Sequence, residues 1–264
     1  MKPLADLRDP RRIRGLLFDI DETLTTDGKL TAEAYSAMER LKAAGKLVVP
    51  ITGRPAGWCD HIARMWPVDA VVGENGAFYF RYFEGRLIRR FYDDGQARAG
   101  RRARLRVIGE RILEQVPGCA LASDQPYRES DLAIDFCEDV PPLPLQTAAR
   151  IAQLMRAEGL NAKISSIHVN GWFGSYDKLA MSKQLFAEVF KCDSAVLRGE
   201  FAFAGDSPND APMFEFFDNS VGVANVARFA DQLEAPPKYV TLAAAGAGFA
   251  ELVAHLLAVS HGAR

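Results

Sequence analysis

Short apolar runs alternate with helical patterns near the start of the chain, and this alternation limits the fold more than any other feature of the sequence. The apolar runs that predict buried strands are 15–18, 47–51 and 68–72. Between them, residues 31–44 carry an apolar stripe at helical spacing, with Thr31 able to cap the helix and Gly45 to end it, and Pro55 can begin a second helix. Strand–helix–strand alternation predicts a parallel sheet with helices on both faces. Pro50 conflicts with this prediction, because proline cannot donate a hydrogen bond in a central strand.

The middle of the chain, residues 83–175, has a different pattern. Polar and apolar residues alternate over 131–136, as they do in a sheet with one wet face, and a helix and a strand are expected at 145–158 and 162–169. After this segment the first pattern returns, with a helix at 177–190 and strands at 201–204, 221–224 and 239–242. The sequence therefore predicts an α/β core made of residues 1–82 and 176–264, interrupted by an inserted α+β domain at 83–175.

Composition excludes several classes of protein. The chain has 264 residues, 48% of them hydrophobic, with a formal charge of -2, which argues against a dedicated nucleic-acid binder. Residues 241–259 are mostly Ala and Gly and contain Glu251 and His255, so they predict a packed C-terminal helix rather than a membrane span. No signal peptide is evident, and the four cysteines are too widely spaced for a metal or redox motif. We expect a cytoplasmic monomer or homodimer with no membrane or nucleic-acid partner.

Carboxylates follow the first strand at Asp19 and Asp21. Alternation along the strand would point both side chains the same way, and like charges this close repel unless a cation compensates them. A hard divalent ion such as Mg²⁺ is the expected partner, although an acidic turn is an equally simple explanation of the pair alone. Asp206 follows the run 201–205 in the same manner and could supply a third oxygen ligand.

Three further groups stand at predicted strand ends or helix starts, where open parallel sheets bind their ligands. Thr52 and Gly53 offer a hydroxyl and bare backbone N–H groups for an anion, or Thr52 simply caps a helix. Lys178 would lie at a helix N-terminus, which is unfavourable for an ammonium group unless an anion binds there. Residues 207–210 can be explained as a capping box, with Ser207 as N-cap and Asp210 closing it.

Taken together and in this order, these groups resemble the motifs of the haloacid dehalogenase (HAD) superfamily of phosphatases. The motifs are DIDET at 19–23, Thr52 within ITGR, Lys178 and GDSPND at 205–210, and ENGA at 74–77 adds to the similarity. The insertion lies where the members with an α+β "C2" cap carry theirs, among them Cof-type, sucrose-phosphatase-like and mannosyl-3-phosphoglycerate-phosphatase-like enzymes. The resemblance implies a Rossmann-like, doubly wound core with this cap.

The resemblance also implies a Mg²⁺-dependent phosphatase acting on a small phosphorylated substrate, such as a sugar phosphate. Asp19 would be the nucleophile that forms an aspartyl-phosphate, and Asp21 would be the acid and then the base. The Asp19 carboxylate, the Asp21 carbonyl and Asp206 would hold the metal, with support from Asp210. Thr52, Gly53, Lys178 and Asn209 would bind the phosphoryl oxygens.

Substrate choice is expected in the cap. Arg128, Glu129, Asp131 and His168 lie on or beside its predicted strands, where an arginine could pair a second anionic group and carboxylates could bind sugar hydroxyls. An ordinary solvated sheet face explains the same residues. Two alternatives are a phosphosugar mutase, although the fourth motif of such enzymes is Gly-rich and differs from 205–210, and a non-catalytic protein that binds a phosphorylated metabolite, against which the intact Asp19 and Asp21 argue.

Overall fold

A six-stranded parallel sheet forms the centre of the core. The computed structural model describes residues 1–165 and 167–258. The strands lie in the order β1 (Lys2–Pro3), β13 (Tyr239–Val240), β12 (Asn219–Gly222), β11 (Phe201–Gly205), β2 (Gly15–Phe18) and β3 (Leu47–Pro50). Strands from the two ends of the chain are thus neighbours in one sheet, which confirms the predicted doubly wound α/β core.

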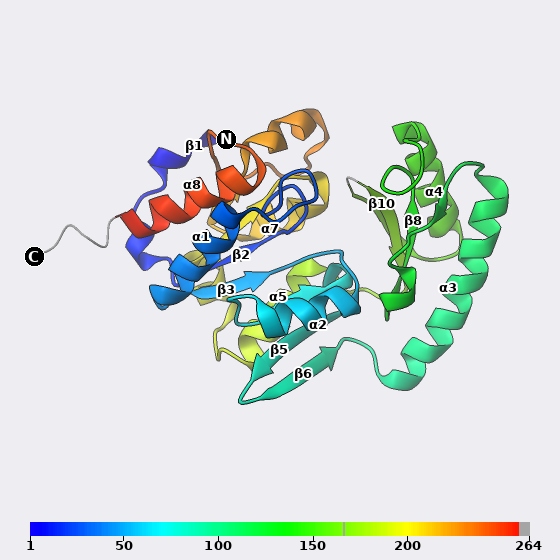
Figure 1. Cartoon of the computed structure of the whole chain (residues 1–264), viewed down its shortest axis with the longest axis horizontal. Helices are drawn as coiled ribbons and strands as arrows, with labels where there is room; N and C mark the ends of the chain where they lie inside the picture. The colour runs from blue at the N-terminus through cyan, green and yellow to red at the C-terminus, as the bar shows by residue number, and fades with distance from the viewer. Residues whose placement is uncertain (166, 259–264) are drawn as a thin grey trace, which may run out of the picture.

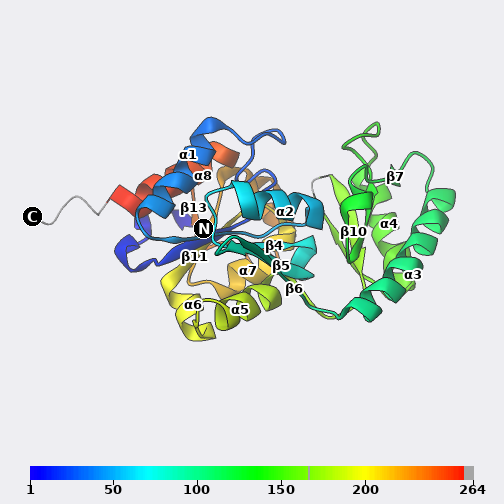
Figure 2. The same ribbon diagram turned by 60° about the horizontal axis from the view of Figure 1, so that its bottom comes forward.

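Helices cover both faces of this sheet (Figures 1 and 2). On one face lie α1 (Ala32–Ala43) and α8 (Ala245–Ala258), and on the other lie α5 (Lys178–Glu188), α6 (Ser194–Glu200) and α7 (Ala211–Phe216). Strand β2 explains why both faces are apolar. Leu16 and Phe18 pack in the cluster with α1 and α8, whereas Leu17 packs in the cluster with α5 and α7. Because β2 is buried on both sides, all of its side chains are apolar, and its sequence is a continuous apolar run rather than an alternating one.

Pro50 fits the sheet because of its position and orientation. It is the last residue of β3, which lies at the edge of the six-stranded sheet. The hydrogen bond to β2 comes from its neighbour, since Ile51 N donates to Phe18 O over 2.7 Å. Successive backbone N–H groups point to opposite sides of a strand, so the nitrogen of Pro50 points away from β2 and no ladder bond is lost.

A three-stranded sheet continues the core beyond β3. It consists of β4 (Val71–Gly73), β5 (Phe78–Phe83) and β6 (Arg86–Phe91), with the 3-10 turn η3 (Glu74–Gly76) between the first two strands. The helix α2 (Ala56–Met65) packs on it through Cys59, Ile62 and Phe78. The β5–β6 hairpin spans the predicted domain boundary at 82/83. Both of its strands pack with the core helix α2.

The inserted segment forms a separate lobe with its own apolar core (Figure 1). Its antiparallel sheet has the order β7 (Ala120–Leu121), β8 (Asp131–Asp135), β10 (His168–Trp172) and β9 (Asn161–Ile164). The helices α3 (Gly95–Gln115) and α4 (Leu145–Ala157) pack on the sheet face away from the core, and the other face is turned toward the core. We call this lobe the cap.

The single strand predicted at 162–169 is wrong, because the chain makes β9 and β10 there. Ser165 N donates to His168 O over 2.8 Å and closes the connection between the two strands. The remaining short elements are η1 (Leu4–Asp6), η2 (Pro10–Arg12), η4 (Gln125–Tyr127), η5 (Pro208–Asp210) and η6 (Ala224–Gln232).

The predicted C-terminal helix is confirmed as α8, which buries Phe249, Leu252 and Val253. Residue 259 lies outside the described residues. In the described part of the chain, every helix is too short or too polar to cross a membrane.

Candidate active site

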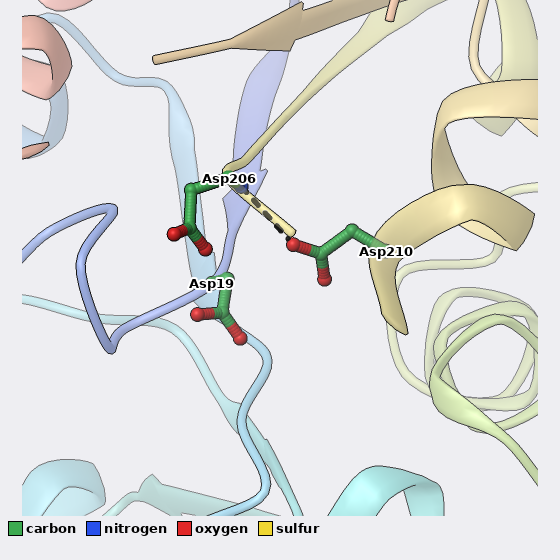
Figure 3. A group of neighbouring side chains, drawn as sticks. All are labelled: Asp19, Asp206 and Asp210. Atoms are coloured by element: carbon green, nitrogen blue, oxygen red, sulfur yellow. Dashed lines mark hydrogen bonds between the residues drawn. The ribbon is translucent and has the colours of Figure 1, made fainter. Parts of the chain in front are cut away.

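The carboxylates of Asp19 and Asp206 meet at the carboxyl ends of β2 and β11. These two strands are hydrogen-bonded neighbours, and Asp19 N donates to Ala204 O over 2.9 Å. Asp206 is the residue directly after the end of β11. Both side chains are buried, and Figure 3 shows them pointing into the same space together with Asp210. One carboxylate oxygen from each of the three lies within 4.8 Å of the other two.

Asp210 holds this cluster together rather than closing a capping box. Its Oδ2 accepts a hydrogen bond from Asp206 N over 3.2 Å, and its Oδ1 accepts one from Lys178 Nζ over 2.8 Å. The hydroxyl of Ser207 lies 2.6 Å from Asn209 Oδ1 instead of capping the turn. The capping-box interpretation of 207–210 is therefore wrong, and the carboxylate of Asp210 faces the site.

Lys178 is the cation of the cluster. Asp177 caps α5 through a 2.7 Å bond from Ala180 N, as predicted, and Lys178 is the first residue of the helix. Its Nζ donates to Asp19 Oδ1 over 2.6 Å, and the residue is only 4% exposed, which excludes a solvated surface lysine. Burial alone would lower the pKa of Lys178, but Asp19 and Asp210 raise it above its ordinary value, so the ammonium group stays charged.

Three buried carboxylates against one ammonium group leave an excess of negative charge. Burial raises the pKa of Asp19 to about 7 in spite of Lys178, and burial together with Asp19 and Asp210 raises the pKa of Asp206 well above its ordinary value. If all three carboxylates are ionised, the cluster carries three negative charges. Lys178 balances one of them, and two remain. Buried oxygen ligands with this excess suit a hard divalent cation such as Mg²⁺.

Asp21 faces the same pocket but is held by an arginine from the core. Arg54 Nε and Nη2 donate to its Oδ1 over 3.0 and 2.8 Å. Arg54 follows Gly53 in the loop after β3, and its guanidinium group lies 4.5 Å from the ring centre of Trp58. The ring of Trp58 holds the guanidinium group of Arg54 in place, and the two hydrogen bonds from Arg54 fix the direction of the Asp21 carboxylate. The sequence contained Arg54 in the motif TGR but gave no indication of its partner.

Gly53 and Asn209 line the pocket above the carboxylates, together with Asp19, Asp21 and Asp206. Thr52 is fully buried directly beside Gly53, and its hydroxyl accepts a hydrogen bond from Arg54 N over 3.0 Å. It does not cap α2, since that helix begins at Ala56. The alternative of a helix-capping threonine is therefore wrong, and Thr52 shapes the loop that carries Gly53 and Arg54.

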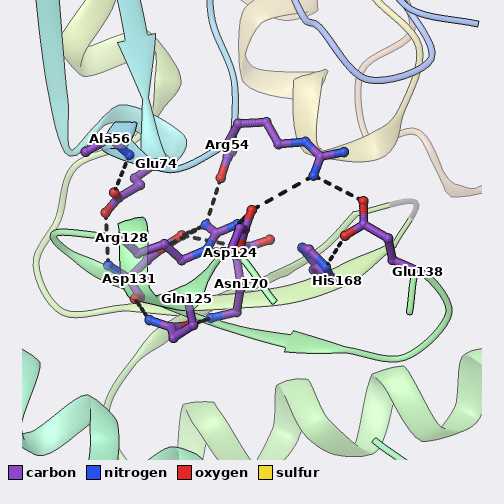
Figure 4. Close-up of polar contacts among 12 residues, drawn as sticks. Arg54, Ala56, Glu74, Asp124, Gln125, Arg128, Asp131, Glu138, His168 and Asn170 are labelled. Atoms are coloured by element: carbon purple, nitrogen blue, oxygen red, sulfur yellow. Dashed lines mark hydrogen bonds and ion pairs between the residues drawn. The ribbon is translucent and has the colours of Figure 1, made fainter. Parts of the chain in front are cut away.

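The cap closes the other side of this pocket, and its lining includes Arg128, His168 and Asn170 (Figure 4). Arg128, predicted as a substrate-binding residue of the cap, is among the residues that line the pocket. Glu129 is not part of this lining, because its carboxylate lies 3.3 Å from Arg102 on the surface and borders a different hollow beside α2. The prediction that Glu129 binds substrate in this site is therefore not supported by its position.

Glu74 is a core residue that fastens the cap. Its buried carboxylate accepts hydrogen bonds from Glu129 N and Ser130 N over 2.8 and 2.6 Å, and from Ala56 N of the core over 3.0 Å (Figure 4). Burial raises the pKa of Glu74 to about 8, with Asp131 adding to the effect. In the sequence Glu74 is notable only as part of the motif ENGA, because no local pattern indicates that a carboxylate will bind backbone groups 55 residues away.

Comparison with known proteins supports this description of the fold. Residues 16–92 match the family described as haloacid dehalogenase-like hydrolase. A crystal structure from Thermoplasma acidophilum has a TM-score of 0.70 at 17% identity and covers 92% of this chain and 98% of its own. The sucrose-phosphatase from Synechocystis, solved with sucrose and phosphate, has a TM-score of 0.63 at 17% identity, with coverages of 92% and 98%.

A HAD phosphatase structure from Bacteroides thetaiotaomicron has a TM-score of 0.61 at 20% identity and covers 94% of this chain and 97% of its own. No curated protein matches the sequence. The motif-bearing segment matches the family, and the fold of the capped structures extends over nine-tenths of the chain. Residues 16–92 are therefore similar to the haloacid dehalogenase-like hydrolase family, and the chain as a whole has the fold of these solved structures, a core with an inserted α+β cap.

Proposed function

We propose that this protein is a Mg²⁺-dependent phosphatase that hydrolyses a small phosphorylated metabolite, a sugar phosphate, through an aspartyl-phosphate intermediate. The observation that carries the proposal is the position of Asp19. Its carboxylate is buried at the end of β2, contacts Lys178 Nζ and lies beside Asp206 and Asp210. A carboxylate nucleophile that attacks a phosphate dianion needs compensating positive charge, because both reactants are negative. Lys178 supplies one such charge, and a divalent cation held by the neighbouring carboxylates would supply the rest.

In the proposed reaction Asp19 attacks phosphorus, and the alcohol leaves with a proton from Asp21. Asp21 then takes a proton from the water that hydrolyses the aspartyl-phosphate. The hydrogen bonds from Arg54 hold the Asp21 carboxylate at the pocket wall for both steps. Thr52, Gly53, Lys178 and Asn209 are proposed to hold the phosphoryl oxygens, and Gly53 and Asn209 line the pocket.

The buried charge of the cluster supports the metal in this proposal. Asp19, Asp206 and the backbone carbonyl of Asp21 would hold Mg²⁺, since these are oxygen donors at one end of the sheet. Both oxygens of Asp210 already accept hydrogen bonds, from Lys178 and from Asp206 N, so Asp210 would support the site and orient its neighbours. When bound, Mg²⁺ supplies positive charge beside the transferring phosphoryl group.

Structures of similar fold include proteins described as sucrose-phosphatase, as related to trehalose-6-phosphate phosphatase and as a HAD subclass IIB sugar phosphatase. Their descriptions support a sugar phosphate as substrate here. A cytoplasmic location and a monomeric or homodimeric state complete the proposal and follow from the expectations of the sequence.

Phosphate release tests the proposal. The purified protein would be incubated with Mg²⁺ and a library of phosphorylated sugars, sugar acids and nucleotides, with the Asp19→Asn variant as control. We expect release from some members by the wild-type protein only. Isomerised phosphosugar without release would indicate a mutase, and bound metal without any reaction would indicate a non-catalytic binding protein.

A further inference from the structure

Two arginines are the cations that line the pocket in the described part of the chain, Arg54 from the core and Arg128 from the cap. An arginine here could in principle pair a second anionic group of a substrate, such as a carboxylate or another phosphate. Whether it does so depends on the donors that its guanidinium group still has available.

All three nitrogens of the Arg128 guanidinium group donate hydrogen bonds within the protein. Nε and Nη2 donate to the two carboxylate oxygens of Asp124 over 2.9 and 3.0 Å. Nη1 lies 3.0 Å from Asp131 Oδ1 and also donates to Gly53 O over 2.9 Å. The side chain is 1% exposed, so Arg128 joins the cap to the loop of Gly53 and offers little to a ligand.

Arg54 is committed in the same way. Nε and Nη2 donate to Asp21, and Nη1 donates to Glu138 Oε1 of the cap over 3.2 Å (Figure 4). Nη1 also lies 3.9 Å from Asp124 Oδ2. With Trp58 on one face of its guanidinium group, Arg54 is a bridge between core and cap rather than an open anion site.

The charge around these arginines is negative on balance. Four carboxylates contact the two guanidinium groups, and they belong to Asp21, Asp124, Asp131 and Glu138. With Asp21 ionised, the sum around the two arginines is an excess of two formal negative charges, and with Asp21 protonated, as the proposed acid, the excess is one. Of the four carboxylates, that of Asp21 lines the pocket itself. An anionic group beside unbalanced carboxylates is repelled, and water screens the buried Asp124 and Asp131 little.

The remaining cap side chains in the pocket suit hydroxyl groups. Asn170 donates to Asp131 Oδ2 over 3.0 Å and also has an amide oxygen, so it can both donate and accept. His168 Nε2 lies 2.8 Å from Glu138 Oε2. Amide and imidazole groups bind hydroxyls without requiring charge.

We propose that the leaving group of the substrate is uncharged, so that the substrate is a monophosphate of a sugar or polyol with no second phosphate and no carboxylate. Glu138 and the carboxylate-paired arginines are the source of this selectivity, which excludes sugar-acid phosphates and bisphosphates. The inference rests on the proposed phosphatase function and specifies its substrate class.

Matched pairs of esters test it. The pairs are glucose 6-phosphate with 6-phosphogluconate, glycerol 3-phosphate with 3-phosphoglycerate, and fructose 6-phosphate with fructose 1,6-bisphosphate. In every pair that is turned over, we expect kcat/KM for phosphate release to favour the neutral leaving group by about tenfold or more.

The variant Glu138→Gln tests the source of the selectivity. It removes one negative charge beside Arg54 and leaves Asp124, at 3.9 Å, as the carboxylate neighbour of Arg54 Nη1 in the cap. The preference for the neutral ester should therefore fall several-fold, mainly through better use of the anionic ester. Asp139→Asn is the matched control, since it removes the same charge from the exposed adjacent residue and should leave the preference unchanged. Thermal unfolding verifies that both variants are folded.

The outcomes separate the two proposals. If no ester in a wide library releases phosphate, the phosphatase function is wrong and the inference falls with it. If phosphate is released and the anionic member of a pair is used as well as the neutral one, the hydrolase stands and the inference is wrong. An equal effect of Glu138→Gln and Asp139→Asn on the preference would also overturn the role of Glu138.

Discussion

Lys178 Nζ donates to Asp19 Oδ1 over 2.6 Å, although the two residues lie 159 positions apart in the sequence. One residue begins helix α5, and the other directly follows strand β2, which precedes the cap in the sequence. The contact joins the two halves of the core at the point where the proposed chemistry takes place.

The first prediction concerns the nucleophile. Asp19→Asn should abolish phosphate release, because an amide cannot form the aspartyl-phosphate. The thermal midpoint should not fall, since the change relieves repulsion with Asp206 and Asp210 while Lys178 keeps Asp210 as partner. Retention of more than about a tenth of the rate, which corresponds to only 1.4 kcal/mol in the barrier, would exclude Asp19 as nucleophile.

The second prediction concerns the cation of the cluster. Lys178→Met should destabilise the protein by about 3–5 kcal/mol, because it leaves Asp19 and Asp210 buried without their partner. Chemical denaturation measures this change. Lys183→Met is the control, since Lys183 is only half-buried and packs over the ring of Phe216, and its effect should be much smaller. Equal destabilisation by both variants would contradict the buried ion-pair arrangement.

The third prediction concerns the metal. Mg²⁺ should raise the thermal midpoint of the folded protein, and a chelator should reverse the rise, because a ligand that binds only the folded state stabilises it. Asp206→Asn should reduce this shift, while Asp218→Asn, at the surface beside Arg198 and Lys238, should retain it. A shift that is the same in Asp206→Asn as in the wild-type protein would place the ion elsewhere.

The fourth prediction concerns pH. The contact with His168, together with Arg54, lowers the pKa of Glu138 to about 2 from an ordinary 4.5. A lowered pKa means that the folded state favours the ionised carboxylate. The stabilising contribution is therefore complete above about pH 4.5 and is lost as the pH falls toward 2.

Thermal midpoints measured across this acid range provide the check. The wild-type protein should lose stability more steeply on acidification than Glu138→Gln, which has no titrating group at this position. Asp139→Asn should follow the wild-type curve. Parallel curves for wild-type and Glu138→Gln would show that the contact between Glu138, Arg54 and His168 does not form in solution.

The fifth prediction concerns the backbone beneath Lys178. Gly76 has φ +107, and a Cβ at this position would overlap the carbonyl group of Asp177, directly before α5. Gly76→Ala should therefore displace the start of α5, and both stability and phosphate release should fall sharply. Gly85 has φ +75 and open space around it. Gly85→Ala should therefore lower the free energy of unfolding by only about 1–2 kcal/mol, the cost of a left-handed backbone at a residue with a Cβ. Similar losses for both variants would contradict the close approach at Gly76.

The core of the site could be predicted from sequence because its residues occupy strand ends. Asp19, Asp206 and Thr52 each follow an apolar run, and the carboxyl ends of parallel strands share one edge of the sheet. Knowing the strands was sufficient to bring these residues together. Lys178 could be placed in the same way from its capped helix.

The partners of the arginines could not be predicted in this way. Arg54 contacts Glu138, which is 84 positions distant, and Arg128 contacts Gly53, which is 75 positions distant. Neither contact follows from strand or helix periodicity, because it depends on how the cap is placed against the core. The split of 162–169 into β9 and β10 was missed for a related reason, since the turn at Ser165 carries neither glycine nor proline.

The sequence by itself determined the α/β core, the inserted cap and the order of the reactive groups, because periodicity and strand-end position are local properties of the chain. Only the tertiary structure decided which charges remain available to a substrate. Arg128 looked like an anion-binding residue in the sequence, and the fold surrounds it with Asp124 and Asp131. The charge that a ligand meets depends on neighbours in space, and residues distant in the sequence supply part of that surrounding charge.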